Sequence, residues 1–340
     1  MDGGHGAEAG CTGGLAPCGG GCVDLGADGD NCGACGRTCA GQKCQTGFCE
    51  PIRLAFGQVG AKRMAVFGTG VYWTAAGNGA VALVSKGGGS VSVLATGIPA
   101  PFGIAVDATA VYFTSEGTAA AQFADGAVEK LPSSGGPPQV LTSGQPRPRD
   151  LRVDAASAYW LDYGPPGSGA VTACSLSSCQ PRTLSLTMIP YGIAINASQV
   201  LFTSVGANAL LGVPVDGGAA SVLDQGLQQP GGVALDDGHA YVADHFGGIV
   251  AAIPLDGGPP ETLGVVKGFP DAVATDGKNV YFTNTQPAPN GGAVMRCAVS
   301  GCAGLPLPVA PSTQAAIDVV VDDTYAYWLT ADGSVWRAAK

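Results

Sequence analysis

One aromatic strand pattern, repeated seven times between residues 71 and 329, constrains the fold of this chain more than any other feature. In each copy a small or branched residue comes first; tyrosine follows in six of the seven copies, a second aromatic residue in six, and threonine in four. A repeat of about 42 residues matches one four-stranded blade of a β-propeller. The pattern therefore predicts an all-β chain whose main domain is a seven-bladed β-propeller. The copies are Val71-Tyr72-Trp73-Thr74, Val111-Tyr112-Phe113-Thr114, Ala158-Tyr159-Trp160-Leu161, Val200-Leu201-Phe202-Thr203, Ala240-Tyr241-Val242-Ala243, Val280-Tyr281-Phe282-Thr283 and Ala326-Tyr327-Trp328-Leu329.

A tight turn is predicted before nearly every aromatic strand. Six of the seven copies have Asp or Asn five residues before the first aromatic position, and such side chains accept backbone hydrogen bonds within turns. We interpret them as structural residues, and Asn196 as a turn residue although it begins an Asn-Ala-Ser sequence. Sequences such as residues 214–218 (Pro-Val-Asp-Gly-Gly) predict the hairpin between the third and fourth strands. The turn residues are Asp107, Asp154, Asn196, Asp236, Asp276 and Asp322.

The seventh repeat lacks a fourth strand at its own end. Residues 53–58 match the fourth-strand sequence of residues 139–145, so an N-terminal strand is expected to complete the last blade. We therefore predict a propeller over residues 52–340, closed by a strand over 52–59. Closure of this kind leaves no free sheet edge and joins both ends of the domain in one sheet.

Eight of the twelve cysteines lie within residues 11–49 and indicate a small disulfide-rich module over residues 11–50, after a flexible N-terminus at 1–10. The segment has almost no large apolar side chains, so covalent bonds must hold it. Disulfides are favoured over zinc because the segment has one Cys-x-x-Cys pair, and the nearby His5 lies outside the framework. We expect all twelve to pair within the chain: Cys11, Cys18, Cys22, Cys32, Cys35, Cys39, Cys44 and Cys49 among themselves, and Cys174 with Cys179 and Cys297 with Cys302 across hairpins.

The cysteine-rich segment resembles a known family. Residues 22–25 (Cys-Val-Asp-Leu), 31–36 (Asn-Cys-Gly-Ala-Cys-Gly) and 47–49 (Gly-Phe-Cys) are similar to the stigma-specific protein family, over about residues 11 to 49. The resemblance implies an extracellular module that contacts surface partners, and similar modules recur in secreted bacterial proteins. Asp24, Asp28, Asp30 and Asn31 are interpreted as turn residues rather than a calcium loop, because Cys32 interrupts the run.

The propeller repeats also resemble known families. The Tyr-Trp-Thr words are similar to those of YWTD propellers, and Gly103–Asp107 (Gly-Ile-Ala-Val-Asp) is similar to words of NHL-type and gluconolactonase-type propellers. The chain differs from the YWTD group in having seven blades rather than six and in lacking the fourth-position aspartate in most copies. The aromatic residues themselves are expected to pack between blades, because alternate residues of a strand face the same side.

Charge and hydropathy exclude several classes of function. The formal charge of −10 and the absence of a basic stripe exclude nucleic acid as a partner. No apolar stretch is long enough for a transmembrane helix. The first ten residues lack the basic and apolar regions of a signal peptide, so we expect that an export signal has been removed. Together with the cysteines, this predicts a secreted, extracellular or cell-surface protein.

Candidate functional residues lie in two sets of loops that converge at one mouth of a propeller. The wider rim comprises Lys62, Arg63, Phe102, Glu116, Tyr163 and Tyr191, and the insertions at residues 164–169 and 286–291 are expected to overhang it. Acidic and amide side chains there can hold a divalent cation such as calcium, and a histidine can act as a base. The predicted ligand-binding residues are Arg149, Asp150, Asp162, Asp244, His245, Asp271 and Asn284.

The sequence favours an extracellular binding, adhesion or scaffold protein that uses the propeller mouth to bind a ligand, with an extracellular protein or glycan as partner. A metal-dependent propeller enzyme, similar to lactonases or lyases, is the alternative. The sequence has no nucleophile elbow, His-Glu-x-x-His or phosphate loop. We expect the mouth aspartates to lie outside the core, because they fall outside the apolar strand words.

Overall fold

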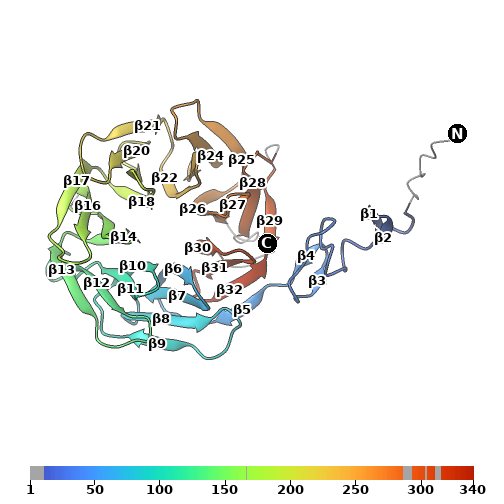
Figure 1. Cartoon of the computed structure of the whole chain (residues 1–340), viewed down its shortest axis with the longest axis horizontal. Coiled ribbons are helices and arrows are strands. Elements are labelled where there is room, and N and C mark those ends of the chain that lie inside the picture. The colour runs from blue at the N-terminus through green and yellow to red at the C-terminus, as the bar shows by residue number, and fades with distance from the viewer. Residues whose placement is uncertain (1–10, 166, 286–292, 303–304, 311–314) are drawn as a thin grey trace.

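The computed structural model describes residues 11–165, 167–285, 293–302, 305–310 and 315–340. These residues form seven four-stranded antiparallel sheets in a ring around a central channel (Figure 1). The structure confirms the predicted all-β, seven-bladed propeller. Among the described residues, no helix is long and apolar enough to cross a membrane.

Blades 1 to 6 are each built from four consecutive strands, the first of which lines the channel (Figure 1). Blade 1 contains β6 (Ala61–Phe67), β7 (Gly70–Ala75), β8 (Ala80–Ser85) and β9 (Ser92–Ala95). Blade 2 contains β10 (Pro101–Val106), β11 (Ala110–Ser115), β12 (Gly126–Pro132) and β13 (Gln139–Gln145). Blade 3 contains β14 (Pro148–Val153), β15 (Ser157–Asp162), β16 (Gly169–Ser175) and β17 (Arg182–Thr187). Blade 4 contains β18 (Pro190–Ile195), β19 (Gln199–Ser204), β20 (Ala209–Pro214) and β21 (Ser221–Gln225). Blade 5 contains β22 (Pro230–Leu235), β23 (His239–Asp244), β24 (Ile249–Pro254) and β25 (Glu261–Val265). Blade 6 contains β26 (Phe269–Thr275), β27 (Asn279–Thr285), β28 (Ala293–Ala298) and β29 (Leu307–Ala310).

Blade 7 combines strands from two distant parts of the sequence. It contains β30 (Ala316–Val321), β31 (Tyr325–Thr330) and β32 (Val335–Ala339), and its outer strand is β5 (Ile52–Ala55). β5 runs antiparallel to β32, with Ala55 opposite Val335 and Arg53 opposite Trp336. β5 ends before the predicted limit at residue 59, because the following residues link blade 7 to blade 1 and the N–H of Gln58 donates to the carbonyl of Gly333 (2.9 Å).

The recurrent aromatic strand is the second strand of each blade and is buried between neighbouring blades. Trp73 and Trp160 are fully buried, as expected for core packing. The predicted turns are confirmed by their hydrogen bonds. Asp322, for example, accepts backbone N–H bonds from Thr324 and Tyr325 (2.9 and 2.8 Å) through Oδ1. Its other oxygen accepts the hydroxyl of Tyr327 (2.9 Å), so one carboxylate fixes both the turn and the aromatic strand.

The N-terminal module consists of two short hairpins, β1 (Ala16–Cys18) with β2 (Gly21–Val23) and β3 (Cys44–Gln45) with β4 (Phe48–Cys49). Its turns use the predicted polar residues, since Asp24 and Asp28 each accept a backbone N–H two residues later (2.8 Å). Its disulfides are Cys11–Cys22, Cys18–Cys35, Cys32–Cys44 and Cys39–Cys49, and two further disulfides, Cys174–Cys179 and Cys297–Cys302, close hairpins in blades 3 and 6.

The second half of the module packs against blade 7. Gln42 is buried, and its Oε1 accepts the backbone N–H of Ala339 in β32 (2.7 Å). The hydroxyl of Tyr325 donates to the carbonyl of Ala40 (3.4 Å). The module therefore lies directly beside the blade that closes the ring (Figure 1).

Candidate binding site at the propeller mouth

The mouth is the face of the propeller on which each blade leads into the next. Inner strands begin there, outer strands end there, and the links from second to third strands return to it. Backbone hydrogen bonds join the two sets of loops, such as Tyr163 N–H to the carbonyl of Arg147 (3.1 Å) and Phe246 N–H to the carbonyl of Gln228 (2.9 Å). The two predicted sets of loops therefore meet at one face.

Every inner strand has a β-bulge just inside the mouth. In all seven blades the register with the second strand shifts at the same place, as between Pro148 and Leu151 in blade 3. A bulge inserts a residue and changes the direction of neighbouring side chains. Arg63, Asp150 and Asp318 occupy this bulge in blades 1, 3 and 7, and all three line the central channel.

In the four blades whose aromatic pattern ends in threonine, the threonine hydroxyl accepts a backbone N–H from the bulge. Thr114 Oγ1 accepts the backbone N–H of Gly103 in the bulge of its own blade (2.8 Å) and donates to the carbonyl of Arg149 in the next blade (2.5 Å). Thr203 forms the same pair of bonds in blade 4. A buried hydroxyl at this position thus links two blades directly beneath the mouth. Blades 3, 5 and 7 have Leu161, Ala243 and Leu329 there and form the bulge without it.

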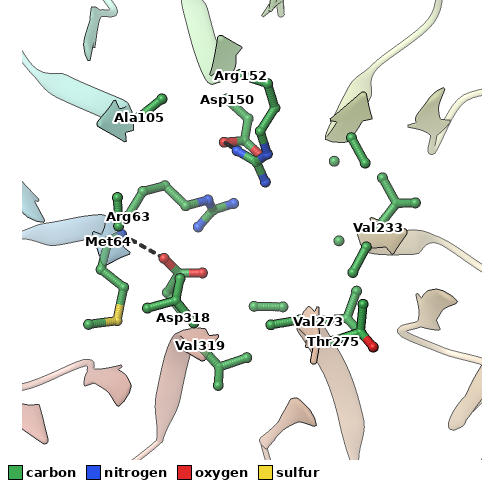
Figure 2. A pocket seen from close by; sticks show the side chains of 18 of the residues that line it. Arg63, Met64, Ala105, Asp150, Arg152, Val233, Val273, Thr275, Asp318 and Val319 are labelled. Carbon is green, nitrogen blue, oxygen red and sulfur yellow. Dashed lines mark hydrogen bonds and ion pairs between the residues drawn. The ribbon is translucent and has the colours of Figure 1, made fainter. Parts of the chain in front are cut away.

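The channel contains a pocket of about 420 Å³ with a polar and an apolar part. Figure 2 shows Arg63 pointing into the channel between Asp318 on one side and the pair of Asp150 and Arg152 on the other. The rest of the wall is formed mainly by short aliphatic side chains of the seven inner strands, including Ala105, Val233, Val273 and Val319. Because the inner strands begin at the mouth, a ligand that enters there meets Arg63, Asp150 and Asp318 before it reaches Arg152 and the apolar wall.

Arg63 is the central charge of this pocket. Burial lowers the affinity of its guanidinium for a proton, but the carboxylates of Asp318, Asp150 and Asp271 outweigh burial, so the pKa of Arg63 is raised. In the described part of the chain none of these carboxylates lies within 4.0 Å of its nitrogens. Arg63 is therefore surrounded by negative charge without a direct ion pair, and its guanidinium is held by a bond from Nη1 to the carbonyl of Lys62 (3.2 Å) and by the rings of Phe102 and Tyr191.

The carboxylates around Arg63 are themselves bonded to the protein. Asp318 accepts the backbone N–H of Met64 through Oδ2 (2.7 Å), and burial raises its pKa to about 6, although Arg63 opposes this shift. Asp150 accepts a bond from Arg152 Nη1 through Oδ1 (3.0 Å) and is buried. These contacts fix both carboxylates in place before any ligand arrives.

A second polar pair crosses the mouth on the opposite side. The hydroxyl of Tyr191 in blade 4 donates to Oδ2 of Asp271 in blade 6 (3.0 Å). The intervening blade has Gly231 at the equivalent position, where a Cβ would lie 2.7 Å from the carbonyl oxygen of Asp271. Burial, together with the charge of Asp271, raises the pKa of Tyr191 to about 12. Tyr191 therefore remains a hydrogen-bond donor at neutral pH.

A row of stacked cations and aromatic rings extends from the channel over blades 2 and 3. We call Phe102, Phe123, Arg147, Arg149 and Tyr163 the Arg–aromatic ridge. Arg149 lies 4.1 Å from the ring centre of Tyr163 and 5.1 Å from that of Phe102, and Arg147 lies 4.5 Å from that of Phe123 and 5.4 Å from that of Tyr163. One carboxylate, Glu116, contacts Nε of both arginines at 2.5 and 3.4 Å.

Three of the predicted ligand-binding residues are buried at or next to the end of their second strands: Asp162, Asp244 and Asn284. Asp162 accepts bonds from Trp160 Nε1 (3.1 Å) and Thr172 Oγ1 (2.6 Å), and burial raises its pKa to about 6.

Asp244 has an equivalent structural position in blade 5. Its Oδ1 accepts the backbone N–H of Gln228 (2.7 Å), which lies in the link from blade 4. The expectation that the mouth aspartates lie outside the core is therefore wrong for Asp150, Asp162 and Asp244. These carboxylates can be buried because each accepts hydrogen bonds from the protein, from Arg152, from Trp160 and Thr172, and from Gln228 respectively.

His245 belongs to an aromatic cluster at the mouth of blades 5 and 6. Its ring lies 5.1 Å from that of Phe246 and 5.2 Å from that of Phe269. Its Nδ1 is 3.2 Å from the carbonyl oxygen of Pro270, to which it can donate. We call these three rings the aromatic cluster; Phe246 is 57% exposed and Phe269 38% exposed.

The predicted calcium ligands are not gathered at one point. Among the described residues, the only three His, Cys, Asp or Glu ligand atoms that lie within 4.8 Å of one another are sulfur atoms of Cys32, Cys39 and Cys49, and these are in disulfides. Asp150 and Asp271 come from different blades and bond to different protein groups. Of the predicted overhanging insertions, residues 286–291 lie outside the described residues, as does Pro166 of 164–169.

Arg152 and Asp318 line the pocket but were missing from the sequence-predicted set. When the seven inner-strand sequences are aligned by repeat, both residues stand out by their charge. Arg152 and Asp318 are charged residues where other blades have alanine or glycine, such as Ala105 and Gly103. A charge that interrupts a small-residue position of an inner strand is therefore the feature that identifies the channel.

Neither a protein-family model nor a curated protein matches this sequence. Among solved structures, the chain is similar to virginiamycin B lyase from Staphylococcus aureus (TM-score 0.70, 13% identity, 86% of this chain and 98% of that chain). It is also similar to the WD40 propeller domain of Doa1 (TM-score 0.68, 13% identity, 86% and 98%) and to a chain of a nidogen/laminin complex (TM-score 0.51, 22% identity, 59% and 79%). The resemblance to the stigma-specific family is not confirmed. At these identities the comparisons show the fold alone: a β-propeller of the general kind used both for binding and in enzymes.

Proposed function

We propose that this protein is an extracellular binding protein that docks a partner protein on the mouth of its propeller. The observation that carries the proposal is the exposure of apolar side chains on this face. Among the described residues, seven of the fifteen exposed large apolar side chains lie at the ends of outer strands or in the mouth loops: Phe56, Val59, Leu186, Met188, Phe246, Val265 and Phe269.

Exposed apolar side chains rimmed by polar groups are typical of protein-binding surfaces. The aromatic cluster supplies two exposed phenyl rings, and the Arg–aromatic ridge supplies arginine and tyrosine, the residue types that contribute most to protein interfaces. The aromatic cluster and the ridge lie on different blades of the same mouth. Their separation favours a partner that covers the mouth over a ligand small enough to sit within the channel alone.

The disulfides support an extracellular setting. All six join cysteines of this chain, and the described residues include no free cysteine. Such bonds persist in oxidising compartments and are rare in the cytosol. An extracellular partner is therefore the appropriate class to test.

The first experiment selects binders to the intact protein from a displayed library of secreted-protein fragments and measures their affinity for two variants. In the mouth variant, Phe246→Ser is combined with Phe269→Ser. In the matched control, Val93→Ser is combined with Val140→Ser, which removes exposed apolar side chains from the outer strands of blades 1 and 2.

We expect the mouth variant to lose about tenfold or more in affinity for the selected fragments, while the control retains it. Both variants should melt within a few degrees of the parent protein, because surface substitutions change stability by about 0.5 kcal/mol. Binders that respond equally to both variants, or to neither, would place the docking surface away from the mouth.

A further inference from the structure

We propose that the Arg–aromatic ridge recognises an acidic segment of the partner; this rests on the proposed function of the mouth. The protein carries a net charge of −10 with only 16 lysines and arginines, yet four cations gather beside two rings, Phe102 and Tyr163. The cations are Lys62, Arg63, Arg147 and Arg149. The carboxylates of Asp318, Asp150 and Asp271 surround Arg63, so the charge offered to a partner lies on the other three. This concentration of positive charge in an acidic protein is complementary to a negatively charged partner.

The positive charge of the ridge is only partly neutralised within the protein. Arg147 and Arg149 share a single carboxylate, that of Glu116. Glu116 is nearly buried, with 10% of its side chain exposed, whereas 30% of Arg147 and 21% of Arg149 remain exposed. The two guanidinium groups are therefore more exposed to solvent than the Glu116 carboxylate that partly neutralises them.

The stacking orders the guanidinium groups before binding. Arg149 contacts two rings, and Arg147 contacts two, with Tyr163 common to both. An arginine that is already held in one conformation loses less entropy when it binds. A stacked guanidinium still presents N–H donors at its edge, and this fork matches a carboxylate. The ridge is thus arranged for carboxylate side chains.

The same face argues for an acidic protein segment rather than a sulfated glycan. The aromatic cluster exposes Phe246 and Phe269, which can pack against apolar side chains that a sulfated glycan lacks. The Arg–aromatic ridge on the same mouth supplies guanidinium groups that can bind carboxylates. A segment that carries both carboxylates and apolar side chains matches both features.

The test uses a short fluorescein-labelled peptide that alternates glutamate with leucine, a matched peptide with glutamine in place of glutamate, and heparin as the sulfated probe. Fluorescence anisotropy measures peptide binding to the full chain, and heparin competes. The variants are Glu116→Gln, the pair Arg147→Gln with Arg149→Gln, and a control pair, Lys43→Gln with Lys278→Gln, which removes two exposed cations outside the mouth.

We expect the acidic peptide to bind about tenfold or more tightly than the glutamine peptide and to weaken as salt rises from about 0.05 to 0.3 M. The Arg147/Arg149 pair should lose that preference, and the lysine pair should keep it. Glu116→Gln should tighten binding, because it removes the competing anion; a variant that failed to fold could not produce this gain. Equal binding of the acidic and glutamine peptides, tighter binding of heparin, or weaker binding by Glu116→Gln would overturn the proposal.

Failure of the acidic-segment proposal gives a different result from failure of docking at the mouth. Library fragments that depend on Phe246 and Phe269 but not on Arg147 and Arg149 would support docking at the mouth and overturn the acidic segment. Fragments that depend on neither pair would overturn the docking proposal itself.

Discussion

Individual aspartates of this propeller have opposite electrostatic behaviour because their surroundings differ. Asp162 is buried and accepts bonds from only two side chains, so burial raises its pKa to about 6. Burial also acts on Asp236, but bonds from Tyr241 and from two backbone N–H groups outweigh it and lower its pKa. The hydrogen bonds that each carboxylate accepts, more than its position in a repeat, determine how its charge affects stability.

Replacing Asp162 with asparagine should make stability less dependent on pH. The pKa of Asp162 is about 6 in the folded protein against an ordinary value of 3.8, so its contribution is fully present below about pH 4 and is lost as the pH rises through 6. Asp162→Asn should therefore gain stability relative to the parent between pH 4 and 7, by at most about 3 kcal/mol. Urea unfolding at several pH values measures the difference.

Asp236→Asn is the matched control with the opposite sign. Because the pKa of Asp236 is lowered on folding, its contribution is present above its ordinary value and is lost as the pH falls. This variant should lose more stability at pH 7 than at pH 4. Parallel pH curves for the two variants would contradict the assigned environments.

At the scale of elements, four of the seven inner strands donate a backbone N–H to a threonine hydroxyl in the strand next to them. Thr114→Val keeps the shape of the side chain but leaves the N–H of Gly103 and the carbonyl of Arg149 without their partner. Each unpaired buried group costs about 1–3 kcal/mol, so we expect a loss of about 2–5 kcal/mol in urea unfolding. Thr262→Val, at an exposed position of β25, is the control and should change stability by less than about 0.5 kcal/mol. If Thr114→Val loses no more stability than the control, the hydrogen bonds of Thr114 do not stabilise the bulge.

The repeat made the strands and turns predictable, whereas the site depended on information that the repeat does not carry. Asp322 and its equivalents were predictable because a turn is local and recurs at fixed spacing. Asp162 and Asp244 follow apolar strands and resemble loop residues, but their burial depends on partners in other segments. Asp318 lies within the apolar sequence of an inner strand, directly after the β-bulge, and lines the channel.

At the scale of the whole molecule, ring closure depends on one short strand. Removing residues 1–51 should leave a folded propeller, because β5 is retained and only the contacts of the module with blade 7 are lost. Removing residues 1–58 also removes β5 and exposes the edge of β32, so we expect a much lower melting temperature and aggregation. Thermal unfolding followed by circular dichroism compares the two. Equal melting temperatures would show that β5 contributes nothing to stability.

The pairing of β5 with β32 also determines the order in which the protein can mature. Roughly 280 residues separate the two strands, which corresponds to tens of seconds of translation at 5–20 residues per second. Throughout that interval the strand made first has no partner, while every disulfide of the neighbouring module needs only cysteines between residues 11 and 49. The smallest part of the protein can therefore be finished first, and the largest part stays an open ring until its last strand has been made.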